Sequence, residues 1–301
     1  MHSIKSIFVE TYSQLLSYYK NNNIAYSVAN QLIKLVFTYD YIILSKSTII
    51  NNEIAKILKE QVYDITVRDM PYQYILGEIS FCNTIIKLKP PVLIPRIETE
   101  ALVFWVIEKL SIYKKNFLNI IDFCSGSGCI GIALLGYFIN SRCTAFDICQ
   151  RSVELSSYNA RINNLKSRYT IYQKDIFTLK KNKKYDIIIS NPPYISLTNY
   201  RQLDNSVKEW ESRNALTDEE NGYRHILHIL KISKNKLNKD AIIIIEICDS
   251  NADFILQEAH KTYPNELAFL WSDQYNKKRA LIIAKGEYKS SFLDSSKNLC
   301  I

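Results

Sequence analysis

The sequence predicts an α/β protein in which a small bundle of helices precedes a mainly parallel, doubly wound sheet. Three observations favour this class. Residues 1–65 carry apolar side chains at helical spacing and show no strand-like alternation. From Thr99 onward, short apolar strands alternate with helices, which is the pattern of a parallel sheet covered on both faces. Three of the chain's seven glycines, Gly126, Gly128 and Gly131, lie close together between a predicted strand and a predicted helix.

The composition is that of an ordinary globular protein. The chain has 301 residues, of which 47% are hydrophobic and 23% charged, enough for two domains or one large one. No apolar run approaches the roughly 18 residues that span a bilayer, and the N-terminus lacks a hydrophobic signal region, so we expect a cytoplasmic protein without a membrane partner. The formal net charge of +8 points only weakly to an acidic partner such as RNA, because the lysines are spread along the chain.

The cysteines and histidines do not predict a metal site. The seven cysteines form no C-x-x-C pair, which argues against a disulfide framework or a zinc site and favours reduced thiols. His225 and His228 are three residues apart on a predicted helix, a spacing that metal ligands can use. Without a third ligand nearby in the sequence, a structural role for both histidines is favoured.

The first part of the chain predicts a helical domain. Apolar side chains recur at helical spacing over residues 7–19 and 28–36, and Asn51 or Asn52 can cap a third helix over 54–61. Prolines and glycine at Pro71, Gly77 and Pro90 then mark a transition that contains a short hairpin over 79–81 and 85–88. The predicted division is a helical domain over 1–75, an interdomain hairpin over 76–92, a second domain over 93–286 and a disordered tail over 287–301.

The second domain predicts seven strands with helices between them. In chain order we expect a helix over 99–112, a strand over 118–123, a helix over 129–137, a strand over 143–147, a helix over 152–163 and strands over 169–173 and 185–190. An irregular segment over 195–220 is followed by a helix over 221–236, a strand over 241–247, a helix over 251–262 and strands over 267–271 and 279–284. No helix separates the last two strands, so one of them is predicted to be antiparallel.

The glycine cluster predicts a nucleotide-like ligand. The spacing Gly126-x-Gly128-x-x-Gly131 matches the dinucleotide fingerprint, and Asp147 ends the next strand, where a carboxylate can bind ribose hydroxyls. The loop also resembles that of Rossmann-like methyltransferases, which have an acid such as Asp122 at the end of the first strand and bind S-adenosylmethionine. The fingerprint alone does not distinguish NAD from S-adenosylmethionine.

The four residues Asn191-Pro192-Pro193-Tyr194 favour methyl transfer. They directly follow the fourth strand, and ligands of open α/β sheets bind at the carboxyl ends of strands. Prolines lack an N–H and have a fixed φ, so this loop is stiff and presents carbonyls as acceptors, to which Asn191 adds its side-chain carbonyl. Such acceptors suit a planar NH2 group, either an amide or a nucleobase amino group, whereas hydride transfer has no use for them. A turn without function is the alternative interpretation.

Taken together, these residues resemble the release-factor glutamine N5-methyltransferases, known as the HemK/PrmC family, over nearly the whole chain. Residues 92–100 resemble the family's signature before the catalytic domain, 122–128 its cofactor loop and 190–195 its substrate loop. Similar blocks lie at Arg68, Pro71, 73–75, Gly77, Glu211, 215–216, 222–224 and 246–247. The chain departs from the family's pattern at four places. Cys124-Ser125 stands where the family has Gly-Thr, and Ile97-Glu98 where it has Pro-Asp. Ser212 replaces a proline and Cys248 replaces a glycine. The side chains at 124 and 125 are small, so we expect the backbone approach to the cofactor to be preserved.

The resemblance implies a Rossmann-like S-adenosylmethionine-dependent methyltransferase domain with a mostly parallel seven-stranded sheet. It implies methylation of the side-chain amide nitrogen, N5, of the glutamine in the Gly-Gly-Gln motif of peptide chain release factors, which the N-terminal helical domain would hold. Asn191 and Pro192 would accept the two amide hydrogens and Tyr194 would pack on the amide plane, with Pro193 completing the substrate loop. The implied cofactor-binding residues are Cys124, Ser125, Gly126, Ser127, Gly128, Asp147, Asp175, Ile176 and Asn191.

Two alternatives remain open. An adenine-N6 methyltransferase acting on nucleic acid would place a flipped base's NH2 group between the same acceptors, but the sequence shows no target-recognition domain and no concentrated basic stripe. A catalytically inactive relative that only binds release factors is the other alternative. The intact Asn191, Gly126, Gly128 and Asp147 argue against it.

Overall fold

The computed structural model describes residues 2–37, 49–50, 52–111, 117–179, 183–290 and 292. It divides into two compact units, one formed by Met1–Glu78 with Asp204–Trp210 and the other by Ile79–Leu203 with Glu211–Ile301. The division falls inside the hairpin that the sequence places between two domains. The sequence prediction did not assign Asp204–Trp210 to the N-terminal unit.

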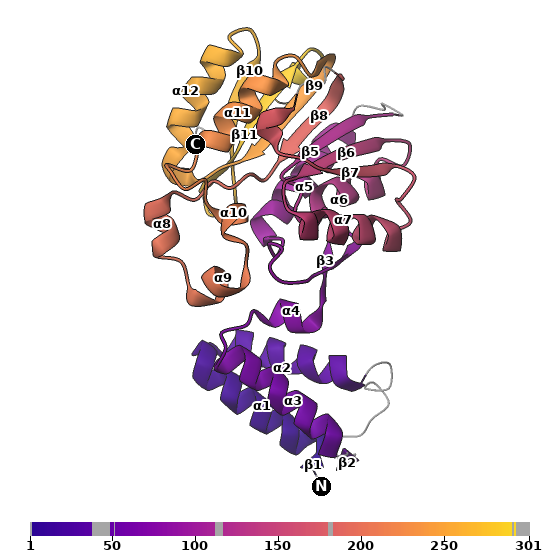
Figure 1. Ribbon diagram of the computed structural model, residues 1–301, viewed down its shortest axis with the longest axis vertical. Helices are drawn as coiled ribbons and strands as arrows, with labels where there is room; N and C mark the ends of the chain where they lie inside the picture. The colour runs from indigo at the N-terminus through magenta and orange to yellow at the C-terminus, as the bar shows by residue number, and fades with distance from the viewer. Residues whose placement is uncertain are drawn as a thin grey trace. The chain divides into compact units, whose positions relative to one another are not determined.

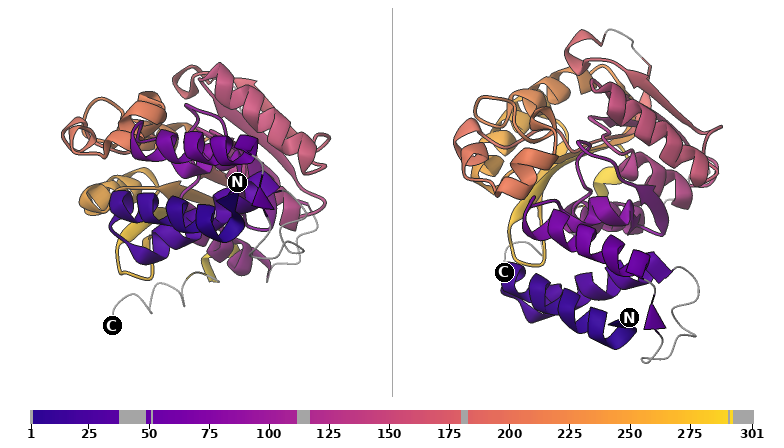
Figure 2. Two further views of the ribbon diagram at one scale, coloured as in Figure 1. Left: turned by 90° about the horizontal axis from the view of Figure 1, so that it is seen from below. Right: turned by 60° about the horizontal axis from the view of Figure 1, so that its bottom comes forward.

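The N-terminal unit is a helical bundle built on α1 (Ile4–Tyr19), α2 (Asn22–Phe37) and α3 (Asn52–Thr66). Its other elements are a short antiparallel pair, β1 (His2–Ser3) with β2 (Ile49–Ile50), and the short helices α4 (Tyr72–Leu76) and α9 (Asn205–Trp210). Figure 2 shows the three long helices, in indigo and violet, packed side by side. The predicted helical domain is confirmed.

A continuous apolar core holds this bundle together. The fully buried side chains include Ile7 and Leu15 on α1, Leu32 on α2, and Leu58 and Ile65 on α3, at the three-to-four-residue spacing that places them on one face of each helix. The short helix α9 is tied to the same unit through the last residue of its range. The indole Nε1 of Trp210 donates to the backbone oxygen of Arg68 at 2.9 Å, just beyond α3.

The second unit is built around a seven-stranded sheet. The hairpin β3 (Glu78–Phe81) and β4 (Thr84–Lys87) precedes it, and its strands are β5 (Asn119–Phe123), β6 (Arg142–Asp147), β7 (Tyr169–Gln173), β8 (Tyr185–Ser190), β9 (Leu237–Glu246), β10 (Leu267–Ser272) and β11 (Lys278–Lys285). The strand order is β10-β11-β9-β8-β5-β6-β7. Only β11 runs against its neighbours, pairing antiparallel with both β9 and β10, so the prediction that one of the last two strands is reversed is confirmed.

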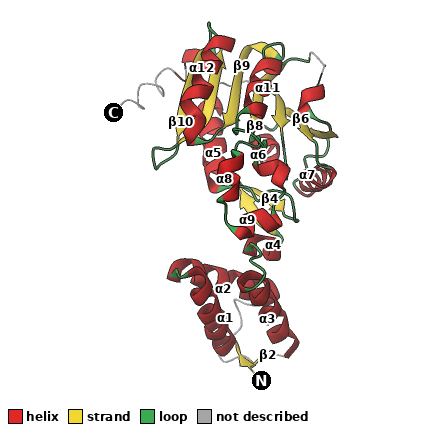
Figure 3. Ribbon diagram, turned by 60° about the vertical axis from the view of Figure 1, so that its left-hand side comes forward, coloured by secondary structure: helices red, strands yellow, loops and turns green. Residues whose placement is uncertain are grey.

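Helices cover the sheet on both faces, as Figures 1 and 3 show. The helices are α5 (Ile97–Ser111), α6 (Cys129–Tyr137) and α7 (Gln150–Ile162), followed by α11 (Arg224–Ser233) and α12 (Ala252–Thr262). Side chains such as Ile121, Ile188 and Ile243 share one buried cluster with α11 and α12. Their neighbours Ile120, Ile187 and Ile242 are equally buried and point to the opposite face, because successive side chains of a strand alternate. Among the described residues, no helix combines the length and the apolar character needed to cross a membrane.

The strand order places a crevice between β5 and β8. From β5 the chain proceeds through α6 to β6 and through α7 to β7, whereas β8 and β9 lie on the other side of β5. Right-handed crossovers in opposite directions therefore diverge at this pair of strands. The carboxyl ends of β5 and β8, with the loops 124–128 and 191–194, meet at this switch point, where open α/β sheets bind their ligands.

Two expectations are wrong in part. The segment 195–220 is not irregular, because it contains α8 (Leu197–Arg201), α9 and α10 (Arg213–Leu216). The tail predicted to be disordered from 287 is ordered where the structure describes it. Residues 288–290 and 292 are helical, Tyr288 is 2% exposed, and the fully buried ring of Phe292 lies 5.4 Å from that of Trp105. Aromatic burial outweighed the polar composition on which the prediction was based; residues 291 and 293–301 lie outside the described part of the chain.

Candidate functional site

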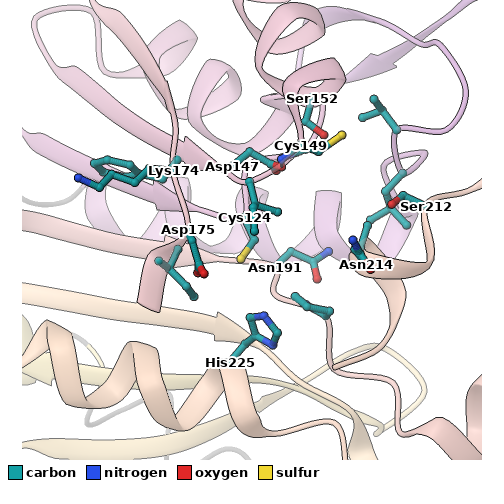
Figure 4. A pocket seen from close by; sticks show the side chains of 18 of the residues that line it. Cys124, Asp147, Cys149, Ser152, Lys174, Asp175, Asn191, Ser212, Asn214 and His225 are labelled. Atoms are coloured by element: carbon teal, nitrogen blue, oxygen red, sulfur yellow. Dashed lines mark hydrogen bonds between the residues drawn. The ribbon is translucent and has the colours of Figure 1, made fainter. Parts of the chain in front are cut away.

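An open cavity, of about 740 Å³ with the solvent space at its mouth included, lies at the carboxyl ends of β5, β6 and β8. All of its lining residues belong to the second unit. Figure 4 shows the labelled side chains around it, from loops and from the first turns of α7, α10 and α11. The sequence-predicted residues that line the cavity are Cys124, Gly126, Asp147, Asp175, Ile176, Asn191 and Pro193.

Two glycines let the first loop turn tightly from β5 into α6. Gly126 has φ 55° and Gly128 has φ 81°, both in the left-handed region that glycine adopts without strain. A Cβ on Gly128 would also overlap the buried hydroxyls of Ser156 and Tyr169, which hydrogen-bond each other at 2.6 Å. The tight turn therefore favours glycine at 126 for its conformation and requires it at 128 for both conformation and space.

Cys124 shares this left-handed conformation. Its φ is 56°, where a residue with a Cβ is strained, and it stands at the position that glycine occupies in the family's pattern. The side chain lines the cavity, and burial raises the pKa of its thiol well above the usual range. The expectation that a small side chain keeps the loop close to its ligand remains a prediction, but the replacement carries backbone strain.

Asp147 joins the glycine loop to the end of β6. Its Oδ2 accepts the backbone N–H of Gly126 at 2.8 Å and its Oδ1 accepts that of Cys149 at 2.9 Å. Burial raises the pKa of this carboxyl, while the hydrogen bonds from Cys149 and Gly126 act in the opposite direction. The carboxylate also lines the cavity, where a ligand hydroxyl can donate to it.

Asp175 and Ile176 form the next part of the wall. Asp175 caps a short 3-10 helix, with its Oδ1 accepting the N–H of Phe177 at 2.9 Å, and Ile176 is 4% exposed. Three other predicted cofactor residues do not line the cavity. Ser125 and Ser127 are 5% and 2% exposed, and with Gly128 they shape the loop from behind.

Asp122 lies beneath this loop, fully buried. Its Oδ2 accepts the N–H of Gly131 at 3.2 Å. Burial raises the pKa of this carboxyl from 3.8 to about 8. The hydrogen bond from Gly131 lowers the pKa in part, and the negative charge of Asp147 makes a smaller contribution that raises it. A neutral carboxyl group at this position avoids the free-energy cost of a buried charge.

The loop after β8 carries Asn191 to the cavity rim. Ser190 Oγ donates to the backbone oxygen of Phe123 at 2.7 Å, which fixes the ends of β8 and β5 together. Asn191 is half-buried and lines the cavity with Pro193, whereas Pro192 and Tyr194 are not among the residues that line it. Tyr194 Oη donates to Glu246 Oε1 at 2.9 Å.

The segment 211–215 forms another part of the cavity wall. Ser212 donates its N–H to the backbone oxygen of Pro91 at 2.7 Å, and both residues line the cavity. Beside this link, Arg96 Nη2 donates to both carboxylate oxygens of Glu211 at 2.8 and 2.7 Å. Burial raises the pKa of Glu211, while the charge of Arg96 acts in the opposite direction. The sequence indicated these residues only through similarity to family blocks, because their spacing of more than a hundred positions carries no local signal.

His225 also lines the cavity, which sequence reasoning missed. Its ring lies edge-on to that of Phe177 with centroids 5.1 Å apart, and its Nδ1 is buried with no hydrogen-bond partner among the described residues. Burial lowers the pKa of this imidazole, so it is neutral at pH 7. The neighbouring His228 places its Nε2 3.1 Å from the backbone oxygen of Ile176, and its ring also packs on Phe177, with centroids 4.3 Å apart.

Comparison with known proteins identifies relatives across most of the chain. Residues 106–209 match the methyltransferase small domain family. A protein of Fusobacterium nucleatum named release factor glutamine methyltransferase is 32% identical over 247 residues, covering 79% of this chain and 68% of the relative. A protein of the same name from Streptococcus pneumoniae is 31% identical and covers 86% of this chain and 90% of the relative. The solved catalytic domain of hMettl16, in complex with an RNA hairpin, has a TM-score of 0.50 at 16% identity over 67% of this chain and 76% of that one, which shows a shared fold alone.

Proposed function

The chain belongs to the release factor glutamine methyltransferase family, and from this premise we propose that it transfers a methyl group from S-adenosylmethionine to N5 of the glutamine in the Gly-Gly-Gln motif of peptide chain release factors. One observation carries the proposal. The amide of Asn191 and the carboxylate of Asp147 line the same cavity from different strands. A methyl donor bound at Asp147 and an acceptor nitrogen bound at Asn191 would therefore share one cavity.

The cavity suits S-adenosylmethionine by its donor and acceptor set. Asp147 presents two acceptors to ribose hydroxyls, the buried Ile176 offers an apolar face to adenine, and the orphaned Nδ1 of His225 lies in the same wall. The carboxylates of Asp147 and Asp175 both face a space that would hold a cationic sulfonium. Bound there, S-adenosylmethionine supplies an electrophilic methyl group.

The loop after β8 would hold the substrate amide. Asn191 Oδ1 and the Pro192 carbonyl would each accept one hydrogen of the glutamine NH2 group, and Tyr194 would pack on the amide plane. The two prolines stiffen this loop, so its acceptors need little reorganisation on binding. Holding both hydrogens helps to free a nitrogen lone pair that is otherwise delocalised into the carbonyl.

Catalysis on this view is mostly positioning and exclusion of water. No base needs to act before the transition state, because the nitrogen can lose its proton as, or after, the C–N bond forms. Correct orientation of two bound reactants can account for about 7–11 kcal/mol of the barrier. The N-terminal unit would bind the body of the release factor, a protein substrate, and the reaction would take place in the cytoplasm.

Methyl-labelled S-adenosylmethionine incubated with the full chain and either release factors or DNA tests the proposal. We expect label in the release factor only, and mass spectrometry of the digest should place a single methyl group on the Gly-Gly-Gln glutamine. Label in DNA alone would identify an adenine methyltransferase and contradict the proposal. Undetectable S-adenosylmethionine binding by calorimetry would indicate the inactive relative instead.

Asn191→Ala is the matching variant. It removes the acceptor for the substrate nitrogen but none of the contacts of Asp147. We expect kcat to fall by about 100-fold or more, as when a single transition-state hydrogen bond is removed, with the cofactor Kd within a few-fold of wild type. A variant with near-normal kcat would remove Asn191 from this role.

A further inference from the structure

Two buried polar side chains behind Asn191 have no part in the proposed reaction. Thr99, in the first turn of α5, is 2% exposed, and Glu246, the last residue of β9, is 3% exposed. Thr99 Oγ1 donates to Glu246 Oε2 at 2.7 Å, and Asn191 Nδ2 donates to Thr99 Oγ1 at 3.3 Å. With the 2.9 Å hydrogen bond from Tyr194 Oη to Glu246 Oε1, the four side chains form one connected network.

The chemistry of the groups gives this network a direction. Burial raises the pKa of Glu246, while the hydrogen bonds from Thr99 and Tyr194 act in the opposite direction. The ionised carboxylate only accepts hydrogen bonds, so in that state the hydroxyls of Thr99 and Tyr194 both donate to it. Thr99 has one hydroxyl hydrogen, which is already given to Glu246. Toward Asn191 its oxygen can therefore only accept, and the Asn191 amide must present Nδ2 to it.

The direction matters because the two ends of an asparagine amide have nearly the same shape. With Nδ2 toward Thr99, Oδ1 is the end left for the cavity, where the proposed substrate NH2 group needs an acceptor. The opposite orientation would place two NH2 groups face to face and leave no acceptor. Shape alone does not select between these orientations, whereas a chain that ends on a carboxylate does.

We propose that Thr99 and Glu246 are positioning residues that hold the Asn191 amide with Oδ1 toward the substrate nitrogen. The inference rests on the proposed function, since it assigns to these residues the orientation that methyl acceptance requires. It also gives the buried carboxylate of Glu246 a reason to be kept, because an uncharged apolar residue there would not order the hydroxyl of Thr99.

Thr99→Val tests this role, because it removes the hydroxyl and keeps the branched shape. We expect kcat to fall by about 100-fold, the size of a misplaced catalytic group, with the KM for the release factor and the Kd for S-adenosylmethionine within about threefold. Thr99→Ser restores the hydroxyl and should recover most of the lost kcat. Thr84→Val is the matched control, since Thr84 is also buried and its hydroxyl also donates a hydrogen bond, to the backbone oxygen of Phe81, but it takes no part in the network around Asn191. It should leave kcat unchanged.

A double-mutant cycle separates positioning from general damage. If Thr99 acts through Asn191, adding Thr99→Val to Asn191→Ala should lower kcat by no more than about twofold further. An equal loss in both backgrounds, or a Thr99→Val protein with wild-type kcat, would overturn the inference while leaving the proposed function in place. A wild-type protein that fails to label the release factor would overturn the proposed function, and this inference with it.

Discussion

Single residues in this site carry two tasks at once, and Asp147 shows this most clearly. Its two oxygens hold the backbone N–H groups of Gly126 and Cys149, and the same oxygens face the cavity. Because both oxygens accept an N–H, an asparagine cannot replace this carboxylate: its NH2 group would have to face one of the two donors. Asp175 differs, since among the described residues only its Oδ1 accepts a backbone N–H, that of Phe177.

We therefore expect Asp147→Asn to weaken S-adenosylmethionine binding strongly although it conserves shape. The loss of hydrogen bonds to a charged acceptor is expected to raise the Kd by about 10- to 100-fold, measured by calorimetry. Asp175→Asn, in the same wall, can keep its bond to Phe177 and should stay within a few-fold of wild type. Equal effects of the two variants would show that the ribose site is wrongly assigned.

Among the elements, the loop after β8 depends on the segment that follows it. Ile195 donates its N–H to the backbone oxygen of Leu216 at 3.0 Å and forms an isolated parallel bridge with Thr217. Gly222, at φ 83°, passes so close to the backbone oxygen of Tyr194 that a Cβ would overlap it. The segment 216–222 is therefore in direct contact with the backbone of Tyr194 and Ile195, which follow the two prolines.

Gly222→Ala should displace this loop. A Cβ there meets backbone atoms that cannot rotate away, so we expect kcat to fall by about 100-fold with cofactor Kd nearly unchanged. Gly77→Ala is the control for backbone strain, because Gly77 has a similar φ of 72° but open space around its Cβ. It should lower the free energy of unfolding by about 1 kcal/mol and leave kcat intact. A Gly222→Ala protein with normal kcat would mean that the loop tolerates displacement.

The ion pair between Arg96 and Glu211 joins the residue before α5 to the segment 211–215 in the cavity wall. Glu211's side chain is 1% exposed and that of Arg96 is 34% exposed. Arg96→Ala would leave a buried carboxylate unpaired, so we expect the free energy of unfolding to fall by about 2–3 kcal/mol, after allowing for the exposure of the arginine, and cofactor binding to weaken. Urea unfolding measures the first effect and calorimetry the second.

Arg213→Ala is the matched control for this prediction. Its pair with Glu219 has a similar length, 2.6 Å, but the two side chains are 50% and 52% exposed. Solvent-exposed pairs contribute about 0–1 kcal/mol, so this variant should be nearly silent in both measurements. An equal loss of stability in the two arginine variants would show that burial of Glu211 does not govern the effect.

At the scale of the whole molecule, the buried carboxyl of Asp122 makes stability depend on pH. Burial raises its pKa from 3.8 to about 8, so the folded protein binds this proton more tightly than the unfolded chain. The resulting stability is fully present below the unfolded pKa and is lost as the pH rises through the folded one. Between these limits this carboxyl alone gives a slope of about 1.4 kcal/mol per pH unit.

Asp122→Asn should remove this slope. Urea unfolding at pH 5 to 9 should give a flatter profile than wild type and a higher free energy of unfolding at pH 9. Asp273→Asn is the control: burial disfavours its charge too, but hydrogen bonds from Arg279, Lys277 and Tyr275 outweigh burial and lower the pKa of this carboxyl. That variant should keep the wild-type slope over this range. A wild-type profile without a slope would mean that Asp122 is ionised in the folded protein.

The fold class could be read from the sequence because apolar periodicity is local. The alternation of strands and helices and the glycine turn each lie within a few residues, and the predicted seven-stranded Rossmann-like methyltransferase domain with an N-terminal helical bundle is confirmed by the sheet order and by the family match. The motifs at Asp147 and Asn191 could be placed at one edge of the sheet for the same reason, since parallel strands end on one side.

The sequence by itself determined the helices and strands, the glycine loop and the hydrogen-bond acceptors of the loop 191–194, because each is encoded by neighbouring residues. Only the tertiary structure decided that Asp204–Trp210 belongs with the N-terminal unit, that His225 faces the cavity, and that Thr99 and Glu246 meet behind Asn191. Thr99 and Glu246 are 147 positions apart, and no periodicity links residues at that distance. Their contact follows from the packing of α5 beside the ends of β8 and β9. That packing depends on side chains buried throughout the unit, and a local sequence pattern does not encode it.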